Sequence, residues 1–298
     1  MPSKLFVFVQ FEVPFPLGPP DGRYVMRLQA GGDPEHVLVL RSESDGSTQV
    51  TVIDAIPLSA EAQARAWMEE LDNELQLEMA LGRLNRALLA YRVAAADQEV
   101  RKVALRHASR AAIGWGTGEQ VADGKYSEAV EVRPQMLRPA PPRPGELDGF
   151  TPGRHAADSA HDRFAALLGE RDRALLCEEL ALRARDDLSS GRPALAAIEL
   201  ERAYNAALEE LDDGTGATTG APRRRGRMAV ASLSERLEEL RGLYPLLAAQ
   251  SRAAIPLADS AEPAADQQPY GGEDLDLELL ERALARLEAA LRARAAGL

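Results

Sequence analysis

Three closely spaced glycines near the middle of the chain are the residues best suited to bind a ligand. Gly114, Gly116 and Gly118 alternate with other residues and flank Trp115. Glycine lets backbone N–H groups approach a phosphate closely, so we expect a loop here that either binds a ligand or packs Trp115 in a tight turn. The packing interpretation is favoured, because the spacing matches neither the dinucleotide-binding fingerprint nor a P-loop.

Acidic side chains and histidines form two further clusters with helical spacing. Glu70, Glu74 and Glu78 lie four residues apart, but no histidine follows Glu74 or Glu78 by three residues, as in di-iron bundles. A second cluster, which combines imidazole and carboxylate groups, contains His155, Asp158, His161 and Asp162. Solvated helix surfaces are favoured in both cases, with Asp158 as an N-cap in the second, so the sequence predicts no metal site and no cofactor.

The sequence offers little support for nucleophilic catalysis. Its single cysteine, Cys177, lies among leucines, where a free cysteine behaves as a small apolar residue. Neither a serine nucleophile elbow nor an H-E-x-x-H zinc motif occurs. We therefore predict no catalytic residue. One cysteine allows no intramolecular disulfide, and the apolar stretch at residues 5–9 is too short for a signal peptide, so we expect a cytoplasmic protein.

The charge balance narrows the classes of partner. The chain has 47 acidic and 35 basic residues and a formal net charge of −12. This excess argues against nucleic acid or anionic lipid as a partner. The basic run at residues 223–227 lacks the interleaved aromatic residues of single-strand binding sites and favours a solvated linker. No apolar run approaches the roughly 18 residues of a membrane-spanning helix, so no membrane partner is expected.

Strand-like apolar runs separated by proline and glycine turns come first in the chain, at residues 5–11, 24–28, 36–40 and 49–54. Their short connections predict an antiparallel sheet. Ser59 is the predicted N-cap of one long amphipathic helix, over residues 59–95, on which the sheet packs. Residues 97–113 and 125–132 fit helix or strand. Residues 1–132 are thus predicted to form a small α+β domain.

The rest of the chain is predicted to be mainly helical. Six prolines in residues 133–153 indicate an extended linker, and residues 154–298 then fit a helical bundle. Its predicted helices cover residues 158–189 and 193–211, a third segment that begins at the capping box of Ser232, and the leucine-rich C-terminus. The polar, glycine-rich composition of residues 212–227 and 255–273 predicts mobile connections.

The last predicted helix carries a stripe of leucines at intervals of three and four, namely Leu277, Leu280, Leu284, Leu287 and Leu291. Such a stripe is too apolar to remain in water, so it must contact the rest of the bundle, a second copy or a protein partner. We therefore predict a non-enzymatic interaction or scaffold protein that acts through leucine-striped helices. The alternative is a ligand-binding or enzymatic N-terminal domain that uses residues 114–124.

Two segments resemble known families. Residues 180–211 resemble a tetratricopeptide unit, whose turn glycine, small and bulky positions are taken by Gly191, Ala196, Leu200 and Ala203. Since a solenoid needs about three stacked units, the resemblance implies a single helical hairpin. Residues 114–124 and 179–185 resemble a family of bacterial proteins to which no activity is assigned, which implies a bacterial, cytosolic protein and no particular chemistry.

Overall fold

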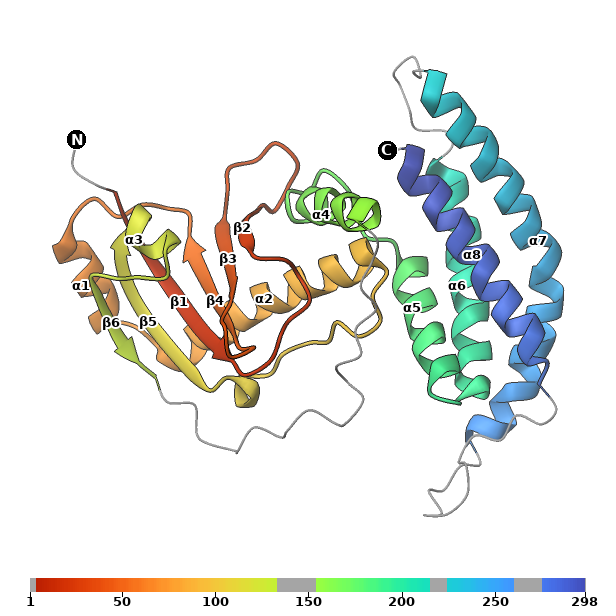
Figure 1. Ribbon diagram of the computed structural model, residues 1–298, viewed down its shortest axis with the longest axis horizontal. Coiled ribbons are helices and arrows are strands. Elements are labelled where there is room, and N and C mark those ends of the chain that lie inside the picture. The colour runs from red at the N-terminus through yellow and green to blue at the C-terminus, as the bar shows by residue number, and fades with distance from the viewer. Residues whose placement is uncertain (1–3, 133–153, 215–223, 260–274, 298) are drawn as a thin grey trace. The chain divides into compact units, whose positions relative to one another are not determined.

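The chain folds into two compact units, Met1–Arg173 and Ala174–Leu298 (Figure 1). The computed structural model describes residues 4–132, 154–214, 224–259 and 275–297. The first unit contains an antiparallel sheet with its helices, and the described part of the second unit is helical. The predicted α+β class, a sheet packed on helix and followed by a mainly helical half, is therefore confirmed.

The sheet of the first unit has six strands in the order β2-β3-β4-β1-β5-β6, and every neighbouring pair is antiparallel. Four strands overlap the predicted apolar runs, although β2 begins and ends two residues earlier than predicted, and two more come from the segments that fitted helix or strand. The strands are β1 (Leu5–Val13), β2 (Gly22–Met26), β3 (His36–Ser42), β4 (Thr48–Asp54), β5 (Arg110–Thr117) and β6 (Glu128–Glu131).

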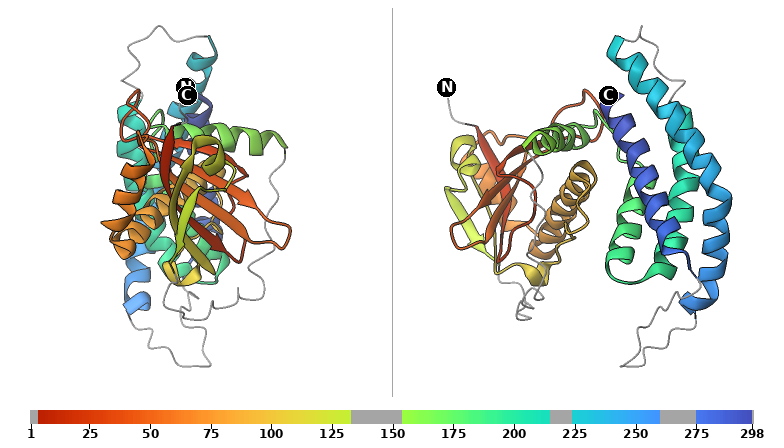
Figure 2. Two further views of the ribbon diagram at one scale, coloured as in Figure 1. Left: turned by 90° about the vertical axis from the view of Figure 1, so that its left-hand side faces the viewer. Right: turned by 45° about the vertical axis from the view of Figure 1, so that its right-hand side comes forward.

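Helices cover both faces of the sheet. Side chains of a strand point alternately to its two sides, so each face contributes its own apolar residues. Leu5 and Val7 of β1 pack with Ala64 of α1 (Glu61–Glu69) on one face. Phe8 packs with Val121 of the short helix α3 (Gly118–Ala122) on the other. The longest helix of this unit, α2 (Asn73–Ala95), lies on the face opposite α3 (Figure 2).

The prediction of one continuous helix over residues 59–95 is wrong. Helix α1 ends at Glu69, and α2 begins at Asn73. The Asp72 carboxylate accepts a hydrogen bond from the Leu75 N–H at 3.1 Å, so it caps a new helix instead of continuing the old one. The predicted N-cap Ser59 is also wrong, since α1 is preceded by Ala60 without a side-chain cap.

The prediction of one helix over residues 158–189 is wrong as well. The chain forms α4 (Arg154–Leu168) and α5 (Leu176–Ser189), and Glu170 between them adopts a left-handed conformation with a φ of 55°. Helix α4 packs on α2 and β2 and lies in the first unit, so the division between units falls after Arg173. The predicted linker at residues 133–153 lies outside the described residues.

The second unit packs α5, α6 (Pro193–Gly214), α7 (Arg224–Asp259) and α8 (Leu277–Gly297) around one apolar core. Tyr204 is fully buried in this core, and its hydroxyl donates to the Ala283 carbonyl at 2.8 Å. Burial raises the pKa of Tyr204 above its ordinary range. A buried phenol with a satisfied O–H contributes apolar area without leaving a polar group unpaired.

The termini of α7 correct three predictions. The helix begins at Arg224, so residues 224–227 are helical and Ser232 lies inside the helix rather than at its start. It continues to Asp259, so residues 255–259 are also helical. Residues 212–214, at the start of the first predicted mobile connection, are helical as well. The remaining parts of the two predicted connections, residues 215–223 and 260–273, lie outside the described residues.

Candidate functional site

The glycine-rich segment is a strand and not the predicted loop. Gly114 lies in β5, where it pairs with Phe8 of β1 and Ala129 of β6. A Cβ atom at Gly114 would lie 2.3 Å from the Glu128 carbonyl oxygen and 2.7 Å from the Ala129 Cα. Glycine at this position therefore allows β6 to approach β5 closely, which is a structural reason for its occurrence.

The neighbouring glycines allow α3 to pack closely on the sheet. A Cβ atom at Gly116 would lie 3.1 Å from Val121 Cγ2 of α3, and one at Gly118, the first residue of α3, would lie 3.1 Å from Phe6 Cε2 of β1. Trp115 points to the opposite face, where it is buried against Leu5 and Val7. The segment thus packs Trp115, but from a strand rather than from a turn.

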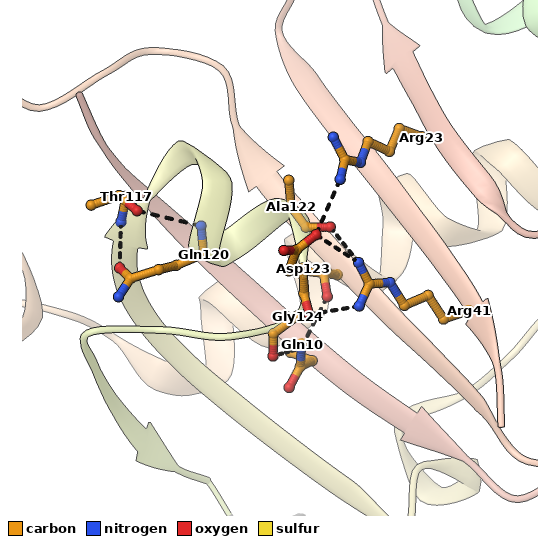
Figure 3. A network of polar contacts seen from close by, with 9 residues as sticks. Gln10, Arg23, Arg41, Thr117, Gln120, Ala122, Asp123 and Gly124 are labelled. Atoms are coloured by element: carbon orange, nitrogen blue, oxygen red, sulfur yellow. Dashed lines mark hydrogen bonds and ion pairs between the residues drawn. The ribbon is translucent and has the colours of Figure 1, made fainter. Parts of the chain in front are cut away.

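A network of polar contacts holds the segment after α3 over the sheet (Figure 3). Arg41 donates to the backbone carbonyl of Asp123 at 2.6 Å, and Arg23 donates to the Asp123 carboxylate at 3.2 Å. Gln10 donates to the Gly124 carbonyl at 3.4 Å. These side chains satisfy the backbone that crosses the sheet, so they have a structural role here.

The leucine stripe of α8 lies mainly in the core of its own bundle. Leu280, Leu284 and Leu287 are buried there, and Leu291 packs against the same cluster. Leu277 is 50% exposed. The sequence left open whether this stripe contacts the rest of the bundle, a second copy or a protein partner. In the structure it contacts the rest of the bundle.

The prediction that Glu70, Glu74 and Glu78 share the surface of one helix is wrong, because the helix is interrupted between Glu70 and Glu74. Glu70 follows the end of α1, whereas Glu74 and Glu78 are exposed on α2. No group of three or more histidine, cysteine, aspartate or glutamate side chains in the described part of the chain could hold a metal ion.

The histidine–aspartate cluster lies on α4. His161 and Asp162 are exposed, and the side chains of His155 and Asp158 lie outside the described residues. His161 contacts the ring of Tyr24 at a centroid distance of 5.7 Å. This contact places His161 beside β2, where it meets residues that local spacing did not single out.

Cys177 is fully buried at the start of α5. Burial, together with a hydrogen bond to Glu210, raises the pKa of its thiol well above the ordinary value. Because the thiolate is the nucleophilic form, this environment makes Cys177 an inert core residue.

A pocket with a volume of about 690 Å³ lies along β2 in the first unit. It is bounded by β2, by the turn after β2, by α4 and by the segment that follows α4. Its lining includes Arg23, Val25, Arg27, His161, Ala165 and Arg171. Three arginines in one pocket give a cationic site in a chain whose net charge is −12.

The three arginines differ in whether a carboxylate neutralises their charge. Arg23 pairs with Asp123, and Arg27 donates from Nε to the Gly32 carbonyl at 2.9 Å. Neither Arg27 nor Arg171 forms an ion pair with a carboxylate in the part of the chain that the structure describes. Asp21 also lines the pocket, but its carboxylate accepts two hydrogen bonds from Ser42, each of 2.8 Å.

An aromatic contact fixes α4 beside β2. The buried Tyr24 ring packs on Phe164 at a centroid distance of 4.6 Å, and its hydroxyl donates to the Pro20 carbonyl at 2.7 Å. Burial raises the pKa of Tyr24 to about 12. The ring contact and the hydrogen bond together hold Tyr24 in the wall of the pocket.

The other end of the pocket is fixed through the backbone of Arg27. Its N–H donates to the Leu168 carbonyl at 3.0 Å, and its carbonyl accepts from Arg86 at 2.9 Å. Arg86 also pairs with Glu170, which holds the segment that carries Arg171. Sequence reasoning missed this site, because its parts lie about 140 residues apart and no local spacing joins them.

Comparisons of this chain with protein-family models, with curated proteins and with solved structures give no match. Among the described residues, no helix has the length and apolar character required to span a membrane. The geometry and charge of the pocket are therefore the features that indicate a function for this chain.

Proposed function

We propose that this chain is a non-enzymatic binding protein whose first unit binds an anionic ligand in the pocket between β2 and α4. The observation that carries the proposal is that Arg27 and Arg171 line this pocket without a carboxylate partner among the described residues. Guanidinium groups are strong, directional donors that suit carboxylate and phosphate groups. A cytoplasmic location, inferred from the single cysteine, belongs to the same proposal.

The arginines of the pocket are suited to binding rather than to proton transfer. Guanidinium groups stay protonated in proteins, so they hold negative charge but do not transfer protons. The leucine stripe of α8 no longer supports the predicted interaction surface, since its central leucines belong to the bundle core. The proposal therefore follows the predicted alternative of a ligand-binding N-terminal domain, but with the pocket beside β2 in place of residues 114–124.

Calorimetric titration with inorganic phosphate and with glutarate tests the proposal. We expect at least one of the two anions to bind wild-type protein, and Arg171→Gln to weaken that binding at least tenfold. Arg106→Gln is the matched control, because Arg106 is an exposed arginine of the same unit that lies outside the pocket. The proposal fails if neither anion binds at millimolar concentration, or if both variants change binding equally.

A further inference from the structure

We propose that the ligand of this pocket is an acidic segment of another protein, which adds to the sheet as an extended strand alongside β2. This proposal rests on the proposed anion-binding function and specifies the partner and the mode of binding. Strand addition needs an edge strand whose outer backbone groups are free, and side-chain chemistry that selects the partner. The pocket supplies both.

Strand β2 is at the edge of the sheet, with β3 as its neighbour. Met26 pairs with His36 of β3, and its carbonyl accepts from the N–H of Glu35, directly before β3, at 2.9 Å, so the backbone groups of Met26 face β3. The Arg27 N–H instead donates to Leu168 at the end of α4, on the side away from β3. Successive residues of a strand direct their N–H and C=O groups to opposite sides, so Arg23 and Val25 face outward as Arg27 does.

The outward backbone groups of Arg23 and Val25 form the open part of this edge. No strand lies beyond them in the described ranges of the chain, and both residues line the pocket. Val25 is 38% exposed, which is high for a valine within a sheet. Two outward residues present two N–H donors and two C=O acceptors, the complement of a short antiparallel strand.

The arginines determine which kind of strand fits. Arg23, Arg27 and Arg171 surround the open edge and attract glutamate or aspartate side chains. A second copy of β2 would bring its own Arg23 and Arg27 to the same place, and like charges on paired strands repel. Charge complementarity therefore favours an acidic partner over self-association through this edge.

Fluorescence anisotropy with a labelled peptide of six residues, alternating glutamate and valine, tests strand addition on the full-length protein. We expect this peptide to bind and the corresponding lysine–valine peptide not to bind. We also expect the backbone amides of Arg23 and Val25 to exchange hydrogen more slowly in the complex. Arg171→Gln should weaken peptide binding at least tenfold, and Arg106→Gln should not.

Two N-methylated peptides separate strand pairing from simple charge attraction. One carries the methyl groups on its glutamate amides and the other on its valine amides. Because only one set of amides can face β2, we expect one methylated peptide to lose at least tenfold in affinity and the other to retain it. Equal affinities of the two methylated peptides would overturn strand addition, whereas binding of phosphate or glutarate would still support the proposed function.

Val25→Pro tests the same edge from the protein side. Proline removes the outward N–H of Val25 but no hydrogen bond to β3, so the sheet should tolerate it at an edge strand. We expect this variant to bind the acidic peptide at least tenfold more weakly than the wild-type protein does. Unchanged peptide binding, or a wild-type dimer that Val25→Pro dissociates in light scattering, would overturn the proposal.

Discussion

Gly114 and Gly82 are both glycines within regular secondary structure, but their surroundings differ. A Cβ atom at Gly114 would lie 2.3 Å from a backbone oxygen of β6, whereas nothing lies within 4 Å of a Cβ atom at Gly82 on α2. A backbone atom cannot rotate away as a flexible side chain can. The substitution of glycine by alanine is therefore expected to change stability in opposite directions at the two positions.

We expect Gly114→Ala to lower the free energy of unfolding by about 1–3 kcal/mol, because the added methyl group must displace β6. Gly82→Ala is the matched control and should raise the free energy of unfolding by about 0.5–1 kcal/mol, since alanine is the better helix former. Urea denaturation followed by tryptophan fluorescence measures both. A neutral or stabilising Gly114→Ala would contradict the close approach of β6.

The strand character of β5 had a visible signal in the sequence. Ala111, Ile113 and Trp115 alternate with small residues, which is the period of two that strands show. The three glycines hid this signal, because glycine is typical of loops and rare inside strands. Only the close approach of β6 and α3 explains why glycine is required there, and such contacts are not encoded in local spacing.

Helix α5 depends on a carboxylate from the next element of the chain. The Glu210 side chain, on α6, accepts hydrogen bonds from the N–H groups of Leu176 at 3.0 Å and Cys177 at 3.1 Å. Both donors lie in the first turn of α5, where N–H groups have no partner within the helix. A negative charge at this end also interacts favourably with the helix dipole.

We expect Glu210→Ala to lower the free energy of unfolding of the helical bundle by about 1–2 kcal/mol, the usual effect of losing an N-cap. Glu210→Gln should lose less, because the amide oxygen can still accept a hydrogen bond. Glu209→Ala removes an exposed carboxylate next to it and should change stability little. Thermal unfolding monitored by circular dichroism compares the three; an equal effect of Glu209→Ala and Glu210→Ala would contradict this role.

Periodicity alone predicted most helices but not where they are interrupted. The apolar pattern of residues 59–95 continues across Asp72, although the side chain of Asp72 begins a new helix. The pattern of residues 158–189 likewise continues across Glu170, where the backbone is left-handed. Interruptions of this kind depend on local backbone conformation and on side-chain hydrogen bonds that replace those within the helix. The spacing of apolar residues carries no information about either.

At the level of the whole molecule, the pocket shows what one-dimensional patterns cannot supply. Its cationic residues come from β2, from the turn after β2 and from the segment after α4, and the contact between Tyr24 and Phe164 brings these together. The composition predicted an acidic protein without nucleic-acid or membrane partners. The net charge of the whole chain does not reveal the local cluster of arginines in the pocket, because residues distant in the sequence form this cluster only in the folded structure.

The division into two units has its own energetic consequence. Each unit has a separate apolar core, and Leu284 lies only in that of the second unit. Both tryptophans, Trp67 and Trp115, lie in the first unit. Tryptophan fluorescence therefore reports on the first unit, whereas the circular dichroism of helices also includes the second.

We expect Leu284→Ala to destabilise the bundle by about 2–5 kcal/mol, as deletion of a buried leucine side chain usually does, and to leave the fluorescence transition in urea unchanged. Gly114→Ala should shift the fluorescence transition instead, and in the double variant each unit should show the effect of its own substitution to within about 0.5 kcal/mol. Leu277→Ala, at an exposed position of the same helix, is the control for Leu284→Ala and should change stability by less than about 0.5 kcal/mol. A fluorescence midpoint that moves with Leu284→Ala as far as the circular dichroism midpoint would show that both units unfold as one.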